Sequence, residues 1–113
     1  MHIEITKYFV AASLLSFVLF ARAHAQPPDQ ATKLRLAQSY EQAGNFETAA
    51  KLYEELLAKD QSNYVYFDSV RRMYLQLKRY DDAIALIQRR LLMNPADLPT
   101  RAILASTYYK SGN

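Results

Sequence analysis

The side chains best suited to acid–base chemistry stand in this sequence as adjacent carboxylate pairs. Glu54 is followed by Glu55, and Asp81 is followed by Asp82. Neighbouring residues of a helix point about 100° apart, so neither pair can direct two carboxylates at one substrate. Solvation of a helix surface explains these pairs better than catalysis does, and we expect that the chain is not an enzyme.

Two residue types that dominate catalytic and metal sites are nearly missing. The chain contains no cysteine, and its two histidines, His2 and His24, both lie within the first 25 residues. Beyond that point there is no residue for a His-dependent triad, a cysteine nucleophile or a zinc site of the usual His/Cys kind. The sequence therefore predicts neither a metal nor another cofactor.

Basic and aromatic residues are numerous enough to raise the question of nucleic-acid binding. The chain has nine tyrosines, five phenylalanines and the basic pairs 71–72 and 89–90, a combination that can stack on bases and contact phosphates. However, the net charge is only +3, and the basic pairs are interleaved with Asp68, Asp81 and Asp82. We therefore expect no nucleic-acid partner.

The first 25 residues differ in composition from the rest. Lys7 precedes an uncharged, largely apolar run over residues 8–21, and Ala23 and Ala25 then occupy the small-residue positions of an A-x-A cleavage site. This order is typical of a secretory signal peptide. We predict a signal peptide over residues 1–25 and an exported protein, either periplasmic or extracellular.

An uncleaved membrane anchor is the alternative. As a helix, the 14 residues of the run 8–21 would reach roughly 21 Å, well short of the roughly 30 Å hydrocarbon core. Glu4 and Arg22 nevertheless depart from the usual signal pattern. A tether to the inner membrane through residues 8–21 therefore stays open, and the membrane is a partner only in that case.

The remaining sequence repeats itself with a period of 34 residues. Residues 26–29 are expected to form a linker, because two prolines block helix formation before Asp29 can cap the next segment. Laying residues 30–63 over 64–97 and over 98–113 then aligns Tyr40 with Tyr74 and Tyr108, and Ala49 with Ala83. Each full repeat resolves into two helices with apolar stripes at helical spacing. These stripes carry Leu36, Ala37, Tyr40, Phe46, Ala49, Ala50, Tyr53, Leu56 and Leu57 in the first repeat, and Phe67, Val70, Tyr74, Leu77, Ala83, Ile84, Ile87 and Leu91 in the second.

This pattern resembles the tetratricopeptide repeat, in which small, aromatic and alanine residues recur at fixed positions of a helix pair. The residues that carry the resemblance are Ala37, Tyr40, Ala49 and Tyr53, then Tyr74, Ala83, Ile87 and Pro95, and finally Ala105 and Tyr108. The resemblance implies an all-α fold, a right-handed helical solenoid of antiparallel helix pairs with about two and a half repeats. The repeats would span residues 30–63 and 64–97, with residues 98–113 as the first helix of a third.

Four residues depart from the family pattern, and one of them, Leu56, is larger than the small residue expected at its position. Arg71 and Arg90 occupy positions where the family has small residues, and their long side chains would have to extend along the surface to keep their charges in water. Otherwise the helices would pack less closely there than is usual in the family. Lys78 replaces the turn glycine, which costs roughly 0.5 to 1 kcal/mol if the turn needs a left-handed residue.

The last segment does not resemble a polar cap. Ile103, Leu104 and Tyr108 have the spacing of a buried stripe, and residues 111–113 lead into a turn. A terminal helix of a solenoid normally turns a polar face to water. We expect that the array is cut within its third repeat and is the N-terminal part of a longer one. The alternative is that this helix is an imperfect cap, and its apolar stripe over residues 98–111 would then favour self-association.

The resemblance implies that a protein or peptide binds to the concave groove lined by the first helix of each repeat. Arg72 is the only cation of the implied groove, so a partner's carboxylate could contact it. Reversal of this charge is then expected to weaken binding and to leave the melting temperature nearly unchanged. The groove residues carried over by register are Leu34, Gln38, Glu41, Asp68, Arg72, Leu75, Ala102, Ser106 and Tyr109.

Two functions remain open on this basis. The first is an exported scaffold or adaptor that mediates protein–protein interaction. The second is an N-terminal accessory region of a larger envelope protein whose enzymatic or transport activity lies beyond residue 113.

Overall fold

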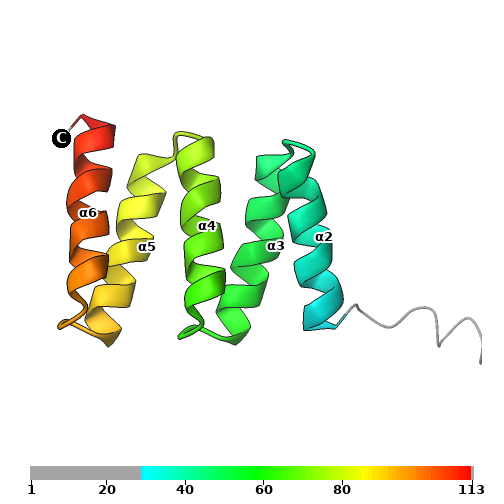
Figure 1. Ribbon diagram of the computed structural model, residues 1–113, viewed down its shortest axis with the longest axis horizontal. Coiled ribbons are helices and arrows are strands. Elements are labelled where there is room, and N and C mark those ends of the chain that lie inside the picture. The colour runs from blue at the N-terminus through cyan, green and yellow to red at the C-terminus, as the bar shows by residue number, and fades with distance from the viewer. Residues whose placement is uncertain (1–28, 113) are drawn as a thin grey trace, which may run out of the picture.

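The computed structural model describes residues 29–112, and this part of the chain consists of α-helices without any strand (Figure 1). Each helix packs against the next one along the chain, and the fold is an all-α helical repeat solenoid of about two and a half repeats, as the sequence predicted. The predicted signal peptide, residues 26–28 of the predicted linker, and Asn113 lie outside the described residues. The helices are α2 (Gln30–Gln42), α3 (Phe46–Lys59), α4 (Tyr64–Gln76), α5 (Tyr80–Met93) and α6 (Leu98–Ser111).

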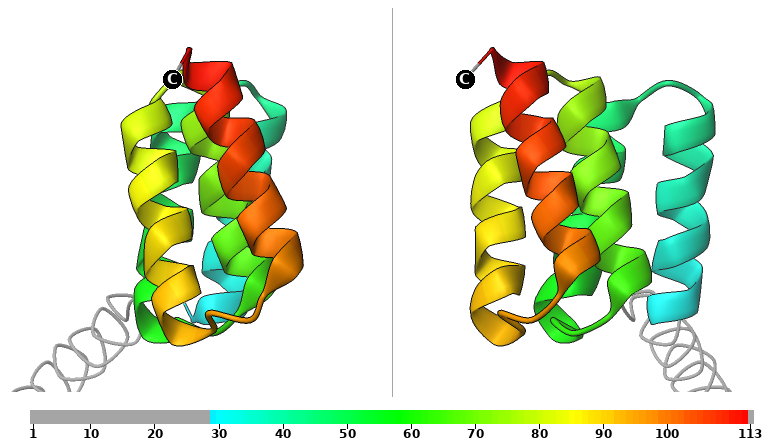
Figure 2. Two further views of the ribbon diagram at one scale, coloured as in Figure 1. Left: turned by 90° about the vertical axis from the view of Figure 1, so that its left-hand side faces the viewer. Right: turned by 60° about the vertical axis from the view of Figure 1, so that its left-hand side comes forward.

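The helices are arranged in two layers. Figure 2 shows α2, α4 and α6 in one layer and α3 and α5 in the other. The first helices of successive repeats therefore share one side of the array. None of the helices in residues 29–112 is long and apolar enough to cross a bilayer.

Acidic and amide side chains fix the starts of most helices. The predicted cap at Asp29 is confirmed, because Asp29 accepts a hydrogen bond from the backbone N–H of Thr32 at 2.8 Å. Asp97 likewise accepts one from that of Thr100 at 3.1 Å. Asn45 and Asn63 cap α3 and α4 in the same way. Each cap satisfies an N–H group that has no partner inside its own helix.

Both full repeats use the same turn between their helices. Gly44 has a φ of 79° and Lys78 a φ of 57°, so both residues are left-handed. In each turn the next N–H donates back to the carbonyl of the repeat tyrosine, from Asn45 to Tyr40 at 2.9 Å and from Arg79 to Tyr74 at 2.8 Å. This is a Schellman motif, which ends a helix with one left-handed residue, usually glycine.

Exchanging the residues at these two matched turns should change stability in opposite directions. Lys78→Gly should raise the free energy of unfolding by roughly 0.5 to 1 kcal/mol, because only a residue with a Cβ is strained there. Gly44→Lys should lower it by a similar amount, since no atom lies within 4 Å of a Cβ built at Gly44 and the backbone alone opposes the change. Urea denaturation of both variants and the wild type measures the effect. A lower midpoint for Lys78→Gly would contradict the assigned turn.

The core is built from small residues between the helices and aromatic residues along them. In the first repeat Ala37, Ala49 and Ala50 have no exposed surface, which lets α2 and α3 approach closely. Other fully buried apolar residues are Tyr53, Leu56, Phe67, Val70, Met73, Ala83 and Ile87. Leu36 was also expected in the buried stripe, but it is 42% exposed. Its counterpart in the second repeat, Val70, is buried because α3 of the preceding repeat lies beside it. Leu36 has no such neighbour, since α2 is the first described helix.

The second repeat is less closely packed because of its arginines. Arg71 stands where the first repeat has Ala37, and α4 packs less closely against α5 than α2 does against α3. Only 19% and 17% of the Arg71 and Arg90 side chains are exposed. Asp68 binds the Arg71 guanidinium at 2.6 Å. The Arg90 guanidinium carbon instead lies over the Phe67 and Tyr64 rings, 4.8 and 5.1 Å from their centroids.

Helix α6 packs onto the array through a face that the apolar pattern did not predict. Thr100 and Thr107 are each 1% exposed, and their hydroxyl groups donate to Asp97 Oδ2 and to the Ile103 carbonyl at 2.6 and 2.7 Å. The predicted stripe of Ile103, Leu104 and Tyr108 is only half-buried, and Ala105 is exposed. Local hydrogen bonds allow threonine to occupy a buried helix face in this way.

Candidate protein-binding groove

The predicted groove residues all lie on the layer formed by α2, α4 and α6. They divide by exposure along this layer. The half-buried members are Leu34, Glu41, Asp68, Arg72 and Leu75, and the exposed members are Gln38, Ala102, Ser106 and Tyr109.

Arg72 joins three of these residues into one network. Its guanidinium binds the Glu41 carboxylate of α2 through Nη1, and its Nε donates to Asp68 Oδ2 at 3.2 Å. The same guanidinium reaches Ser69 Oγ at 3.3 Å through Nη2. The network therefore ties the first helix of one repeat to the first helix of the next.

A tyrosine from the other layer completes the network. The hydroxyl of Tyr53, on α3, donates to Glu41 Oε1 at 2.7 Å. Glu41 of α2 thus binds Tyr53 of α3 and Arg72 of α4. The repeat position of Tyr53 predicts a packing role, and no local sequence pattern indicates its hydrogen bond to Glu41.

Comparison with known families identifies the repeats. Residues 34–63 and 67–99 match the tetratricopeptide repeat model. The chain belongs to the tetratricopeptide repeat family. No curated protein matches it. Tetratricopeptide repeats generally serve as protein–protein interaction scaffolds, and this is the general function of the fold described above.

The sequence suggested that Arg72 could contact a partner's carboxylate, and the structure of the tetratricopeptide groove differs on this point. This guanidinium is already bound by the carboxylates of Glu41 and Asp68, so it does not stand as a free cation for a partner's carboxylate. On α6 the groove is uncharged, and Tyr109 is 88% exposed beside Ser106.

Metal ligands do not gather in the described tetratricopeptide repeats. Within residues 29–112 there is no group of three or more histidine, cysteine, aspartate or glutamate side chains placed to hold a metal ion. The carboxylates of the groove are instead engaged by arginine and tyrosine side chains.

Two buried tyrosines make the tetratricopeptide repeats sensitive to alkali. Burial, and to a smaller extent the hydrogen bond to Glu41, raises the pKa of Tyr53 to about 12. Burial and the hydrogen bond to Glu54 likewise raise the pKa of Tyr74 to about 12. Because both values lie above the unfolded value of about 10, folding favours the neutral phenols. Their stabilisation is complete below pH ~10 and is lost as the pH rises towards ~12.

The alkaline loss of stability should therefore depend on these hydroxyl groups. Between pH ~10 and ~12 the urea midpoint of the wild type should fall more steeply than that of Tyr53→Phe, which has no phenol to ionise at this site. Tyr109→Phe, at an exposed position, serves as the matched control and should behave like the wild type. Equal slopes for the wild type and Tyr53→Phe would contradict the assignment.

Proposed function

We propose that this protein is an exported scaffold or adaptor that binds a protein or peptide segment on the layer formed by α2, α4 and α6. The observation that carries the proposal is the exposed, uncharged surface of α6 within the family's groove register. There Tyr109 is 88% exposed, and Ala102 and Ser106 are exposed with it. An exposed aromatic side chain beside small residues offers apolar contact area at little cost in conformational entropy.

The proposed partner surface is apolar or neutral rather than acidic. Arg72 is held by two carboxylates of its own chain, and an acidic partner would have to displace them. Leu75 and Tyr109 can instead contact apolar side chains, and Gln38 can supply hydrogen bonds. A terminal carboxylate is therefore not the feature that we expect this groove to select.

Export is part of the proposal and is supported by the sequence pattern of residues 1–25, with a periplasmic or extracellular location. The alternative is a tether to the inner membrane through residues 8–21. N-terminal sequencing of the protein from its native host distinguishes them. A chain that begins at Gln26 supports export with cleavage, and one that retains residues 8–21 supports the tether.

We also propose that α6 is the first helix of a further repeat in a longer array. Ala105 supports this, because it is exposed although its counterpart Ala37 is fully buried against α3. A second helix packed on this face would bury Ala105 as α3 buries Ala37. The intact mass of the native protein tests this part: a mass well above that of residues 26–113 supports it, and a mass equal to theirs contradicts it.

The groove itself is tested by blocking it. Peptides selected from a random 12-residue library on the immobilised protein should bind Ser106→Trp at least about tenfold more weakly than the wild type, because a large side chain then fills the exposed face of α6. Ser62→Trp, at an exposed residue of the loop between α3 and α4, is the matched control and should bind normally. Equal loss in both variants, or loss in neither, would contradict the proposed groove.

A further inference from the structure

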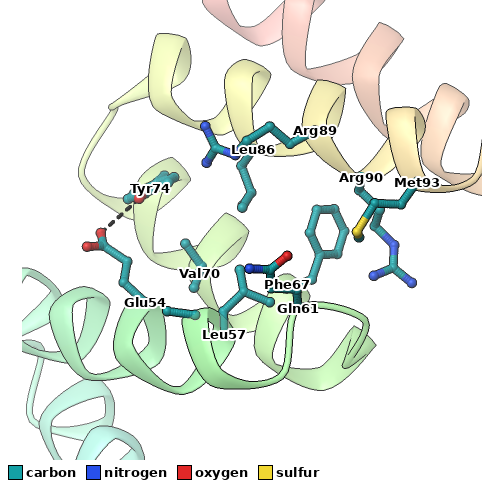
Figure 3. A pocket seen from close by; sticks show the side chains of 11 residues that line it. Glu54, Leu57, Gln61, Phe67, Val70, Tyr74, Leu86, Arg89, Arg90 and Met93 are labelled. Atoms are coloured by element: carbon teal, nitrogen blue, oxygen red, sulfur yellow. Dashed lines mark hydrogen bonds between the residues drawn. The ribbon is translucent and has the colours of Figure 1, made fainter.

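A cavity of about 370 Å³ lies outside the groove, between α3, α4 and α5. Figure 3 shows side chains from these three helices converging on it. Its lining residues on α4 are Phe67, Val70 and Tyr74. They occupy a different face of that helix from Asp68 and Arg72, because helix positions one residue apart differ by about 100°. The cavity is therefore separate from the proposed groove.

The cavity lies in the repeat whose two helices pack less closely. Ala37 lets α2 and α3 approach closely in the first repeat, whereas Arg71 replaces that alanine in the second. α4 and α5 consequently pack less closely. The cavity lies where α5 leaves space against α3 and α4.

The interior of the cavity is apolar. Its walls are formed by Leu57, Phe67, Val70 and Leu86, and Ala58 and Met93 stand at its exposed edge. A volume of this size is within the range of about 300–1,000 Å³ found for small-molecule sites, which are mostly apolar with a few polar groups.

The polar groups at the edge favour an anion. The only carboxylate among the lining residues is Glu54, and it already accepts a hydrogen bond from the Tyr74 hydroxyl at 2.8 Å. Arg89 is exposed and forms no ion pair with any residue in 29–112. Arg90 Nε is buried without a hydrogen-bond acceptor there, although Asp97 Oδ2 lies 3.8 Å away. Among the lining residues, Arg89 is thus the cation without an anionic partner in residues 29–112, because Arg90 pairs with Asp97.

We propose that this cavity binds a small amphiphilic carboxylate, with its apolar tail between α3 and α5 and its carboxylate at Arg89. The tail covers apolar surface of the half-buried Leu57 and of the exposed Ala58 and Met93, which favours binding. Phe67, Val70 and Leu86 line the cavity but are already buried. The carboxylate forms a charge-assisted pair with the Arg89 guanidinium.

Two methionines provide a direct readout of binding. Met93 lines the cavity and is 54% exposed, whereas Met73 is 1% exposed in the core and is not a lining residue. In the full chain labelled with 13C-methyl methionine, octanoate should shift the Met93 signal saturably and leave that of Met73 almost unchanged. Octylammonium, which has the same tail and the opposite charge, should bind at least about tenfold more weakly. An unmoved Met93 signal, or equal or tighter binding of octylammonium, would overturn the proposal.

Variants test the two ends of the ligand separately. Arg89→Gln should weaken octanoate binding about tenfold, while Arg101→Gln, at an exposed arginine of α6, should not. Ala58→Phe fills the mouth of the cavity from an exposed position and should abolish the Met93 shift without loss of helicity. Octanoate binding that survives both Arg89→Gln and Ala58→Phe unchanged would place the ligand elsewhere and refute the site.

Discussion

Replacing Phe67 with alanine should lower the free energy of unfolding by about 3–5 kcal/mol, which is the usual cost of removing a fully buried aromatic side chain. Phe67 is 1% exposed, and it lies where α3, α4 and α5 meet. The variant would also take away the ring beneath the Arg90 guanidinium. Since whole domains are stable by only about 5–15 kcal/mol, we expect a large fall in the melting temperature.

Circular dichroism during thermal and urea unfolding measures this effect. Tyr64→Ala is a suitable control, because Tyr64 is 50% exposed and also contacts the Arg90 guanidinium. It should cost far less than Phe67→Ala, since it leaves the core filled. Phe67→Leu should lie between them. Similar losses for Phe67→Ala and Tyr64→Ala would show that the cation–π contact, and not core packing, determines stability at this point.

Charge reversal at Arg72 should lower the free energy of unfolding by about 1–3 kcal/mol. The substitution removes a guanidinium that holds Glu41 and Asp68 and places a third carboxylate between them. Loss of one partner leaves charges uncompensated, and the effect is moderated because 42% of the Arg72 side chain is exposed. From the sequence alone an unchanged melting temperature was expected, and the network replaces that expectation.

A second substitution separates this network from a general effect of surface charge. Arg35→Glu reverses an exposed arginine of α2 that contacts only Thr32, at 3.4 Å, and it should change stability little. The double variant Glu41→Arg with Arg72→Glu restores one ion pair in the opposite sense and should recover part of the loss. If Arg35→Glu costs as much as Arg72→Glu, the network does not stabilise the array.

The sequence predicted the parts of the fold that depend on local pattern. The five described helices follow from apolar residues at helical spacing, and Asp29, Gly44 and Asp97 marked helix ends through their own chemistry. The repeat alignment placed Lys78 at the position of the turn glycine, and Lys78 is left-handed with a φ of 57°.

Features that depend on contacts between repeats were not predicted. Arg72 and Glu41 are 31 residues apart, and their pairing follows only once α2 and α4 lie side by side. Thr107 appeared as a polar helix residue, yet its hydroxyl bonds to its own helix and allows burial. The cavity between α3, α4 and α5 was not predicted either. Arg71 indicated looser helix packing in this repeat, but it did not indicate a cavity.

The tie between Glu41 and Arg72 also has a mechanical consequence. In a solenoid each repeat contacts only its neighbours, so bending takes place where neighbouring elements meet. In this protein the contacts at these places differ in extent. Between α2 and α4, Glu41 forms an ion pair with Arg72 and also accepts a hydrogen bond from Tyr53 of α3. By contrast, α4 and α5 make the least contact of any two consecutive helices in residues 29–112. We therefore expect the protein to be stiff at its N-terminal half and compliant beyond α4, so that a load applied along the array would be taken up mainly at the α4–α5 joint.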